Sequence, residues 1–445
     1  MPTILERYRE TFSKDRELAL RDSTLLPDGV SSDSRVMTPF PMYADRAAGS
    51  KKWSVSGVEL IDYWSGHGAL LLGHNPPEMI AAVTAQVQRG THYGACHPFA
   101  ADWAALVTEL IPGAERVRFT GSGTEANLIA IRLARTFTGK NKVLRLIEHY
   151  HGWQDTVYQG IEGPVETVPG IPEGVNETTV VCPPNDLHAI ENVLANDPDI
   201  ACVILEPTGP CSGVVPLNDT FLRPLRDLTR THGVVLIFDE IVTGFRVAPG
   251  GAQAHYQVLP DLTTLAKILA GGLPGGAVTG KKEIMDLLSV NDAPPGRKVP
   301  HLGTYNANPL SACAGIAVLN TVKTGVPQQK ANHAAKELRD GLNRIIDAHG
   351  LDWVVYGEFS MLKFLVGHGD RVKARDFDPY KWDYRKLTAR GNRQLWATFR
   401  LGMLVNGVDL SLSSATMAAH SAEDIQKTLV AFEQTLAWMR SEQLI

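Results

Sequence analysis

The sequence lacks the features that mark secreted, disulfide-bonded and membrane proteins. Its N-terminal segment, MPTILERYRETFSKDRELALRD, is charged throughout and has no apolar core, unlike a signal peptide or a membrane span. Only five cysteines are present, an odd number at scattered positions without the short spacing typical of metal ligands. We therefore expect a cytoplasmic protein with reduced thiols, no metal site and no membrane association.

A surplus of basic charge is also missing. The formal net charge is -5 at pH 7, and no cluster of lysine and arginine reverses it locally, which argues against nucleic-acid binding. Repeats and low-complexity tracts are absent as well. What is present is a chain of 445 residues, 44% hydrophobic and 20% charged, which is enough for a substantial core in two or three domains. We expect its partners to be small molecules.

The most informative stretch covers residues 234–276. It opens with five apolar residues, 234–238, whose length and β-branched content predict a strand buried on both faces of a parallel sheet. Asp239 follows at the carboxyl end of this strand, where open α/β sheets bind their ligands. A carboxylate in such a place is costly without a cationic partner, so we expect a positive group to face it.

Lys267 is the candidate for that positive group. It lies in a second apolar run, 262–269, followed by four glycines that would let the backbone approach a flat ligand. A desolvated lysine becomes a nucleophile toward aldehydes, and an aspartate can hold a pyridine nitrogen protonated. Singly, each residue has an ordinary explanation: the lysine as a surface side chain, and Asp239 with Glu240 as a helix N-cap pair. Together they fit pyridoxal phosphate (PLP) chemistry.

The segments FDEIVTGFR and LAKILAGGLPGG resemble the class III PLP-dependent aminotransferases. Within that family they resemble the branch of glutamate-1-semialdehyde aminomutase, β-amino-acid aminotransferases and D-phenylglycine aminotransferase. The resemblance implies an α/β protein of PLP-dependent transferase fold type I, with a large, mostly parallel seven-stranded sheet domain and a smaller α+β domain. We expect an N-terminal arm and part of the small domain in 1–65, the large PLP-binding domain in 66–322, and the C-terminal small domain in 323–445.

The resemblance also assigns residues to the coenzyme. It implies that Lys267 binds PLP as a Schiff base and moves protons, while Asp239 keeps the ring an electron sink. Tyr150, in the segment HYHGW, matches the aromatic side chain over the coenzyme ring, although a core pair with Trp153 would explain it equally. Thr304 matches the residue that reaches the phosphate of the neighbouring subunit, which implies a homodimer with shared active sites.

A phosphate-binding turn is predicted in TGSGTEAN. A short strand precedes it and an apolar-periodic helix follows, so the turn presents backbone N–H groups and hydroxyls at a helix N-terminus. Ser122, Gly123 and Thr124 are the residues we expect to hold the phosphate. A helix cap with Glu125 nearby explains the same sequence without a ligand.

Three further residues are assigned to the substrate. Arg35 ends GVSSDSR, which resembles the segment whose arginine binds the substrate carboxylate through a bidentate fork; a solvated surface charge is the alternative. The resemblance places Trp64 and His67, in WSGHG, at the substrate end of the pocket, where the histidine could be a wall residue without a catalytic role. The partner of the PLP phenolic oxygen stays open between Cys211 and Ser212, because the segment reads TGPCSG here.

Other segments give expectations about shape. Residues 4–21 carry apolar positions at helical spacing among many charges and predict a surface helix, or an arm of the kind that wraps a partner subunit. WSVSGVELIDY predicts a hairpin. Residues 367–386 are charged and aromatic without periodicity, which predicts a mobile loop.

The expected activity is amino-group transfer from an amino acid to a keto acid. The mutase branch carries a glutamate about ten residues before an AHTEED-like helix start, and that place falls on or beside Leu412, with Ser411, Ser413 and Ser414 around it. A second ammonium group would lose hydration there without compensation, so we expect a β-amino-acid or D-arylglycine-type donor. The alternative is glutamate-1-semialdehyde 2,1-aminomutase, which uses the same PLP residues. A PLP-binding regulatory protein without turnover would not need the Asp–Lys pair.

Overall fold

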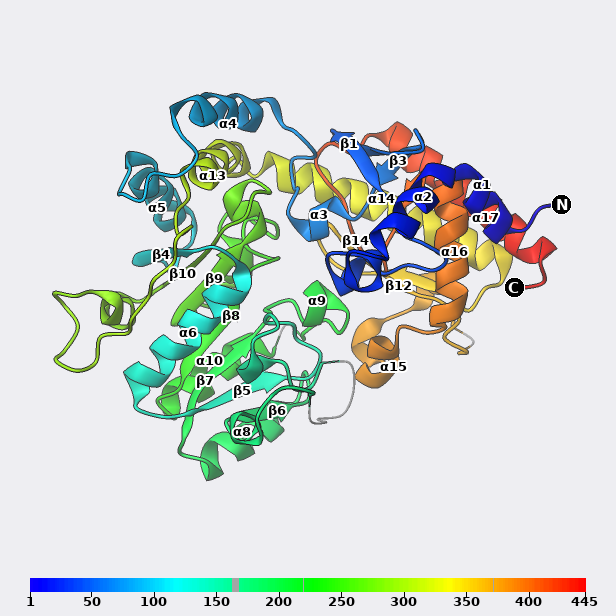
Figure 1. Ribbon diagram of the computed structural model, residues 1–445. Coiled ribbons are helices and arrows are strands. Elements are labelled where there is room, and N and C mark those ends of the chain that lie inside the picture. The colour runs from blue at the N-terminus through cyan, green and yellow to red at the C-terminus, as the bar shows by residue number, and fades with distance from the viewer. Residues whose placement is uncertain (162–167, 219, 371) are drawn as a thin grey trace.

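The computed structural model describes residues 1–161, 168–218, 220–370 and 372–445. Figure 1 shows two lobes, a larger one built around a long sheet and a smaller one that contains both chain termini. The larger sheet has seven strands in the order β4-β10-β9-β8-β7-β5-β6. Only β10 runs antiparallel to its neighbours in these pairings, which confirms the predicted mostly parallel sheet. The strands are β4 (Arg116–Thr120), β5 (Lys142–Leu146), β6 (Thr179–Cys182), β7 (Ile200–Leu205), β8 (Val235–Asp239), β9 (Leu262–Ala266) and β10 (Gly276–Gly280).

Strand β8 is buried along its whole length because helices cover both faces of the sheet. Its alternate side chains enter two different cores. Val235 and Ile237 pack with α6 (Gly123–Thr138), whereas Leu236 and Phe238 pack with residues of α8 (Leu187–Asn196) and α10 (Leu222–Thr231). Both sets must therefore be apolar, which is why this strand shows no alternation in the sequence.

A third group of helices covers the antiparallel end of the sheet. Helix α13 (Pro309–Val322) packs against α4 (Pro77–Arg89), α5 (Pro98–Leu110) and the short turn that begins at Lys267. Their shared core includes Trp103, Leu269 and Leu319. The lysine segment is therefore held on one side by packed helices.

The smaller lobe joins the two ends of the chain. One core contains residues from the first sixty, such as Leu60, together with Leu338, Phe399 and Phe432 from the last part of the chain. Because one core unites both ends, we keep 1–65, 66–322 and 323–445 as our proposed division. The lobe has a four-stranded sheet, β1 (Ala44–Ala48), β2 (Lys51–Ser54), β3 (Glu59–Asp62) and β13 (Val408–Asp409), a three-stranded sheet, β11 (Val354–Tyr356), β12 (Met361–Leu365) and β14 (Ser413–Ala415), and helices α14 (Val326–His349), α16 (Arg393–Val405) and α17 (Ala422–Ser441).

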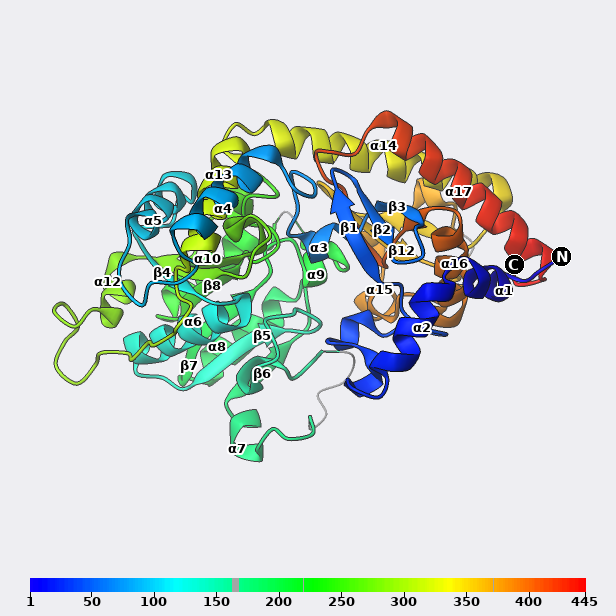
Figure 2. The ribbon, with the colours of Figure 1, turned by 45° about the horizontal axis from the view of Figure 1, so that its top comes forward.

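The N-terminal segment forms two helices, α1 (Ile4–Thr11) and α2 (Ser13–Asp22). Ile4, Tyr8 and Phe12 are fully buried in the small-lobe core, and Figure 2 shows α1 beside α16 and the end of α17. The predicted surface helix is confirmed, but its apolar face is covered by its own chain. The antiparallel pairing of β2 with β3 likewise confirms the predicted hairpin.

The expected mobile loop at 367–386 has local structure in its described part, which omits position 371. It contains short helical turns at Ala374–Asp376 and Pro379–Lys381. The Ala374 backbone N–H donates to Asp347 Oδ1 at 2.7 Å, and Phe377 and Trp382 pack against the small-lobe core. The aromatic residues that broke the sequence pattern thus pack this segment against the lobe, which the sequence did not predict.

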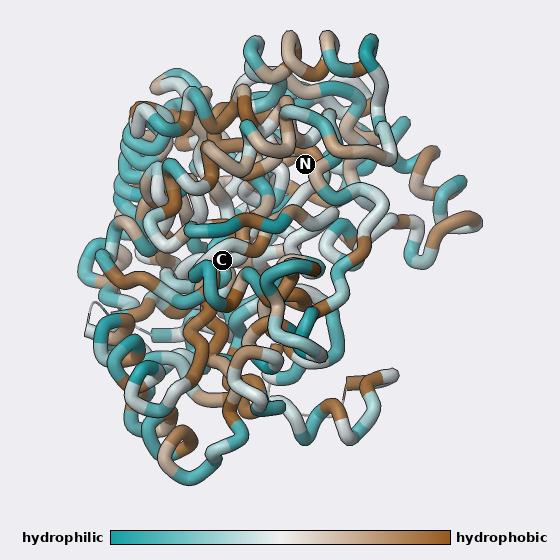
Figure 3. Tube along the Cα trace, turned by 90° about the vertical axis from the view of Figure 1, so that its left-hand side faces the viewer, coloured by the Kyte–Doolittle hydropathy of each residue, from teal (hydrophilic) through white to brown (hydrophobic). Residues whose placement is uncertain are grey.

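Apolar stretches are short throughout the chain. Figure 3 shows brown and teal residues interleaved along the trace, as expected for helices with one apolar face. Among the described residues, no helix is both long enough and apolar enough to cross a bilayer.

Candidate active site

The structure brings Asp239 and Lys267 to the same edge of the large sheet. Strands β8 and β9 are parallel neighbours, with Asp239 opposite Thr264, and Lys267 follows directly after β9. Burial lowers the pKa of Lys267, and the charge of Asp239 acts in the opposite direction, so the two groups lie within electrostatic range. This is the juxtaposition that the sequence predicted.

The backbone at Lys267 is in the left-handed region, with φ of 52°. Such a conformation costs a residue with a Cβ atom about 1–3 kcal/mol and is found at functional sites. Two of the glycines that follow are required by the protein's own packing. A Cβ at Gly271 would lie 2.8 Å from Ala314 O, and one at Gly276 would lie 2.5 Å from Ser122 O. At these two positions the close approach is to the protein's own backbone, which a side chain would block.

Asp239 is held by two residues that our sequence reading did not connect with it. Asn127 Nδ2 donates to Asp239 Oδ2 at 2.8 Å, and His151 Nδ1 lies 2.7 Å from the same oxygen. Thr264 Oγ1 donates to Asn127 Oδ1 at 2.6 Å and fixes the amide. Burial lowers the pKa of His151 far below its usual value, so the ring is neutral and its Nδ1–H donates. The carboxylate is thus oriented by hydrogen bonds.

Burial raises the pKa of Asp239 to about 6, while the hydrogen bond from Asn127 acts to lower it. A positively charged group beside this carboxylate would favour its ionised form. A protonated pyridine nitrogen is such a group, and the site offers it a buried, oriented anion.

The predicted phosphate turn begins helix α6. Ser122 is the N-cap, and its Oγ accepts from the Glu125 backbone N–H at 3.3 Å, so the capping alternative is correct. A cap and a phosphate site do not exclude each other, because the first N–H groups of a helix have no partner within it. Gly123 and Thr124 form the first turn of this sixteen-residue helix.

The segment around Tyr150 is fixed by Glu206, which follows β7. The Tyr150 backbone N–H donates to Glu206 Oε1 at 2.9 Å. The Tyr150 side chain is 48% exposed and that of Trp153 is 74% exposed, so the two do not form a core pair. A half-exposed aromatic ring next to the site is available to stack on a ligand.

Glu206 also organises the turn that contains Cys211 and Ser212. Their backbone N–H groups donate to its two carboxylate oxygens at 2.9 and 3.0 Å. Burial, followed by the charge of Asp239, raises the pKa of Glu206 to about 7. Ser212 Oγ is buried without a hydrogen-bond partner in the described parts of the chain, and Cys211 lies within electrostatic range of Lys267. Both residues therefore remain candidates for the coenzyme's phenolic oxygen.

Trp64, His67 and Arg35 gather at one side of Lys267. The Trp64 and His67 rings meet edge to face at 4.9 Å. Burial lowers the pKa of His67, and the positive charges of Lys267 and then Arg35 lower it further. His67, Lys267 and Arg35 therefore lie in one region. Arg35 is exposed and donates to Ser31 Oγ. No carboxylate of the described residues pairs with Arg35, so the guanidinium can bind an external one.

Arg246, within the segment TGFR, is a further residue that the sequence did not single out. It is buried, and its guanidinium donates to Gly68 O at 2.8 Å, Ser360 Oγ at 2.9 Å and Thr416 O at 3.2 Å. These acceptors belong to the WSGHG segment and to the small lobe. Arg246 therefore ties the segment after Asp239 to the opposite wall of the site.

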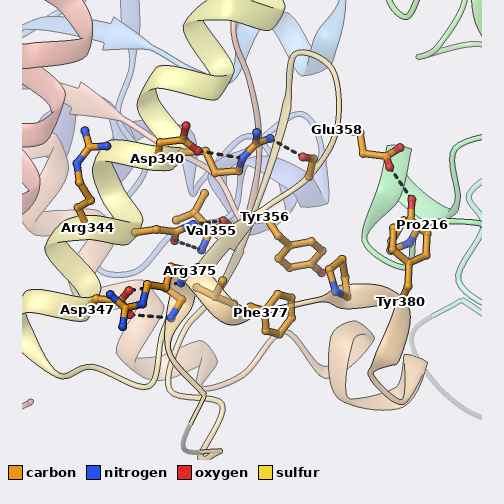
Figure 4. A pocket seen from close by; sticks show the side chains of 16 residues that line it. Pro216, Asp340, Arg344, Asp347, Val355, Tyr356, Glu358, Arg375, Phe377 and Tyr380 are labelled. Atoms are coloured by element: carbon orange, nitrogen blue, oxygen red, sulfur yellow. Dashed lines mark hydrogen bonds and ion pairs between the residues drawn. The ribbon is translucent and has the colours of Figure 1, made fainter.

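Thr304 does not join this group within one chain. It lies in an exposed segment in which Leu302 is 96% and Tyr305 66% exposed. A cavity of about 660 Å³ in the small lobe is also separate from the residues assigned to the coenzyme (Figure 4). Several polar groups around it have partners within the chain: Tyr380 OH donates to Glu358 Oε1 at 2.5 Å, and Arg339 donates to Gly357 O at 2.6 Å.

These residues fit PLP: a partly buried lysine with a lowered pKa for the aldehyde, an oriented carboxylate for the ring nitrogen, and a helix N-terminus for the phosphate. Together with the seven-stranded sheet, they define a PLP-dependent enzyme of fold type I.

Comparison with known proteins gives the family. The model of the class III aminotransferases matches residues 32–354, and the chain belongs to this family. It is 38% identical to glutamate-1-semialdehyde 2,1-aminomutase of Ignicoccus hospitalis, covering 95% of this chain and 99% of that one. The mutase of Methanopyrus kandleri is 37% identical, covering 96% and 98% of the two chains.

Solved structures include transaminases with the same fold. An omega-transaminase from Sphaerobacter thermophilus has a TM-score of 0.88 at 28% identity, covering 97% of this chain and 99% of that one. A β-phenylalanine aminotransferase from Variovorax paradoxus has a TM-score of 0.85 at 26% identity, covering 98% and 97%. The resemblance read from the sequence is confirmed, and the protein is an enzyme that uses PLP.

Proposed function

We propose that the enzyme transfers an amino group from a β-amino acid or a D-arylglycine-type donor to a keto acid. The observation that carries this proposal is the composition of the loop at 411–416, which reads SLSSAT and contains no carboxylate. A diamine bound in a partly dry pocket needs a negative partner for its second ammonium group.

Two serines of this loop form hydrogen bonds with each other. Ser414 Oγ accepts from the Ser411 backbone N–H at 3.0 Å and donates to Ser411 O at 2.9 Å. Leu412 packs against the small-lobe core, and its carbonyl accepts from the Phe364 N–H at 3.0 Å. We expected Leu412 to face the substrate, but its side chain packs against the small-lobe core. The missing carboxylate, rather than an apolar side chain, argues against a diamine.

Bound PLP would supply an electron sink for the carbon that loses its proton. Lys267 would bind the coenzyme and then hold and return that proton at Nζ, a role that its burial-lowered pKa favours. Asp239, oriented by Asn127 and His151, would keep the ring nitrogen protonated. Ser122, Gly123 and Thr124 would hold the phosphate, Tyr150 would cover the ring, and Arg35, Trp64 and His67 would receive the substrate.

We also propose a cytoplasmic homodimer in which Thr304 of a second copy completes each phosphate site. The exposed Leu302 and Tyr305 flank Thr304, and exposed apolar side chains of this size favour burial at a contact.

Glutamate-1-semialdehyde 2,1-aminomutase is the second candidate, supported by the curated relatives, which carry that name at up to 38% identity. The two activities are separated by incubating the PLP-loaded enzyme with glutamate-1-semialdehyde and no acceptor. In parallel, β-phenylalanine or D-phenylglycine is supplied with a keto acid. We expect amino transfer in the second assay and little 5-aminolevulinate in the first. Robust 5-aminolevulinate formation without an acceptor would make the mutase the correct function.

Arg35→Lys should weaken the substrate complex. The lysine keeps the charge but loses the planar pair of donors, and one charge-assisted hydrogen bond is worth about 1.5–3 kcal/mol. We expect kcat/KM to fall by about 10- to 150-fold. Arg16→Lys, at an exposed position of α2, is the control. If Arg35→Lys and Arg16→Lys behave alike, Arg35 is only a surface charge.

A further inference from the structure

A second group of cations lies where the two lobes meet. Lys363 in β12 and Arg390, directly after α15 (Tyr384–Ala389), come from the small lobe. Lys363 Nζ donates to Cys211 O at 2.6 Å, and an Arg390 guanidinium nitrogen lies 3.6 Å from Cys211 Sγ. Cys211 belongs to α9 (Pro210–Gly213), which lies between the lobes in Figure 1. We call Lys363 and Arg390 the interlobe cation pair.

The interlobe cation pair has no carboxylate partner within the described chain. Lys363 is 1% exposed, and burial lowers its pKa to about 8. The ammonium has three donors, and the Cys211 carbonyl accepts one of them. The charge of such a deeply buried group is unfavourable without an anion nearby.

Other buried cations of this protein are better satisfied. Lys52 Nζ lies between Asp62 Oδ1 at 3.0 Å and Asp409 Oδ2 at 2.6 Å. Arg246 lacks a carboxylate, yet three chain oxygens accept its hydrogen bonds. The interlobe cation pair differs from both cases, because no carboxylate of the described residues forms an ion pair with it and Glu206 acts on Lys363 only through its charge at longer range. A bound anion would stabilise this pair.

The interlobe cation pair belongs to the surroundings of Lys267. The pKa of Lys267 is lowered by burial, and the charges of Asp239, Glu206 and Cys211 oppose this shift. Glu206 and Cys211 act in the same way on Lys363. Hydrogen bonds join the two places: Glu206 accepts at 2.9 Å from the backbone N–H of Tyr150 and at 2.9 Å from that of Cys211, whose carbonyl binds Lys363. Arg35, which acts electrostatically on His67, is a second cationic centre of this region. A ligand with two carboxylates matches two such centres.

We propose that the interlobe cation pair binds the distal carboxylate of a dicarboxylic substrate, most simply the keto acid that accepts the amino group; this rests on the proposed aminotransferase function. Arg390 is partly exposed and offers a planar fork for direct contact. Lys363 contacts the Cys211 carbonyl and adds a positive charge. Solvent screens this charge little because the side chain is buried. Donor and acceptor occupy the site in turn, so an apolar donor and a dicarboxylic acceptor are compatible.

Binding can be measured without turnover. Glutarate has two carboxylates but no keto or amino group, and butyrate has one carboxylate. Calorimetry on the PLP-loaded full-length enzyme should show tighter binding of glutarate. Arg390→Gln should weaken glutarate about 10- to 100-fold and leave butyrate within about twofold, since one charge-assisted contact is lost. Arg385→Gln, an exposed position on α15, is the matched control and should change neither affinity.

Lys363→Met provides a second, independent test and should weaken glutarate in the same direction. The thermal midpoint and the coenzyme absorbance of each variant show whether the site is intact. Equal affinity of the parent for glutarate and butyrate would overturn the proposal, as would unchanged glutarate binding in both variants.

Acceptor kinetics then separate this inference from the proposed function. In Arg390→Gln, KM should rise about 10- to 100-fold for 2-oxoglutarate and stay constant for pyruvate. If the parent transfers no amino group to either acceptor, the proposed function fails, while the glutarate result still judges the interlobe cation pair. If both acceptors work and the variant treats them as the parent does, only the inference fails.

Discussion

Replacing Lys267 with alanine should abolish amino-group transfer while leaving a folded protein that still retains PLP. Lys267 is the partly buried amine directly after β9. Its loss removes both the covalent link and the proton-transferring group, so we expect a decrease in kcat of about 10⁴-fold. The helix N-terminus and Asp239 remain, so coenzyme absorbance should persist after gel filtration.

Borohydride reduction supplies the control for this experiment. In the parent it should fix the coenzyme to Lys267, identified by mass spectrometry of the labelled peptide, and in Lys267→Ala no label should remain. Lys363 is the competing site, because it is buried and lies within electrostatic range of Glu206 and Cys211. A label on Lys363 or on any other lysine would show that the central assignment is incorrect.

Asp239→Asn should cause the next largest loss. The amide has nearly the same shape but no charge, so it cannot stabilise a protonated ring nitrogen. The NH2 group of the asparagine would also face a hydrogen-bond donor in either orientation. One orientation places it against Asn127 and His151, and the other against the Ile241 N–H, which donates to Asp239 Oδ1 at 3.1 Å. Removing one preorganised electrostatic contact typically costs 10²–10³-fold, and we expect kcat to fall by about that factor.

Glu240→Gln is the matched control, because Glu240 is the adjacent buried carboxylate. It accepts from Thr243 Oγ1 and from the Ala252 and Gln253 backbone, so its role is to hold the next helix. We expect Glu240→Gln to lower the thermal midpoint without changing the pH titration of the coenzyme absorbance. Asp239→Asn should shift that titration. The assignment of Asp239 would be refuted if its variant kept parental kcat and titration.

The large sheet could be predicted because its central strands are buried on both faces, which leaves uninterrupted apolar runs in the sequence. Asp239 and Lys267 could be paired because each ends such a run, and the ends of parallel neighbours lie together. Asn127 and His151 could not be connected with Asp239 in this way. They are 112 and 88 residues from it in sequence, and only the packing of α6 and the loop after β5 brings them near.

The interlobe cation pair was equally hidden. Lys363 lies in the strand segment MLKFL, where a single lysine reads as the solvent-facing position of a strand, yet the strand is buried throughout. Arg390 follows a short helix in a charged segment and carries φ of 58°. Its approach to Cys211 depends on how the two lobes meet. Local sequence determines the strand and the turn, but not the partner of either side chain.

Because both chain ends share one lobe, the N-terminal helix can reach its final position only after the C-terminal helix has been synthesised. The Ile4 backbone N–H donates to Glu442 Oε1 at 2.6 Å, and the Arg7 guanidinium lies 4.5 Å from the Trp438 ring centre. At typical translation speeds of about 5–20 residues per second, the ribosome needs roughly 20–90 s to make the chain between these partners. Until α16 and α17 are made, Ile4, Tyr8 and Phe12 lack core partners such as Phe399 and Phe432, although the last strand of the large sheet, β10, has been made well before. The growing chain therefore carries an N-terminal helix whose apolar face stays uncovered until the last helix emerges, and a chaperone can bind that face.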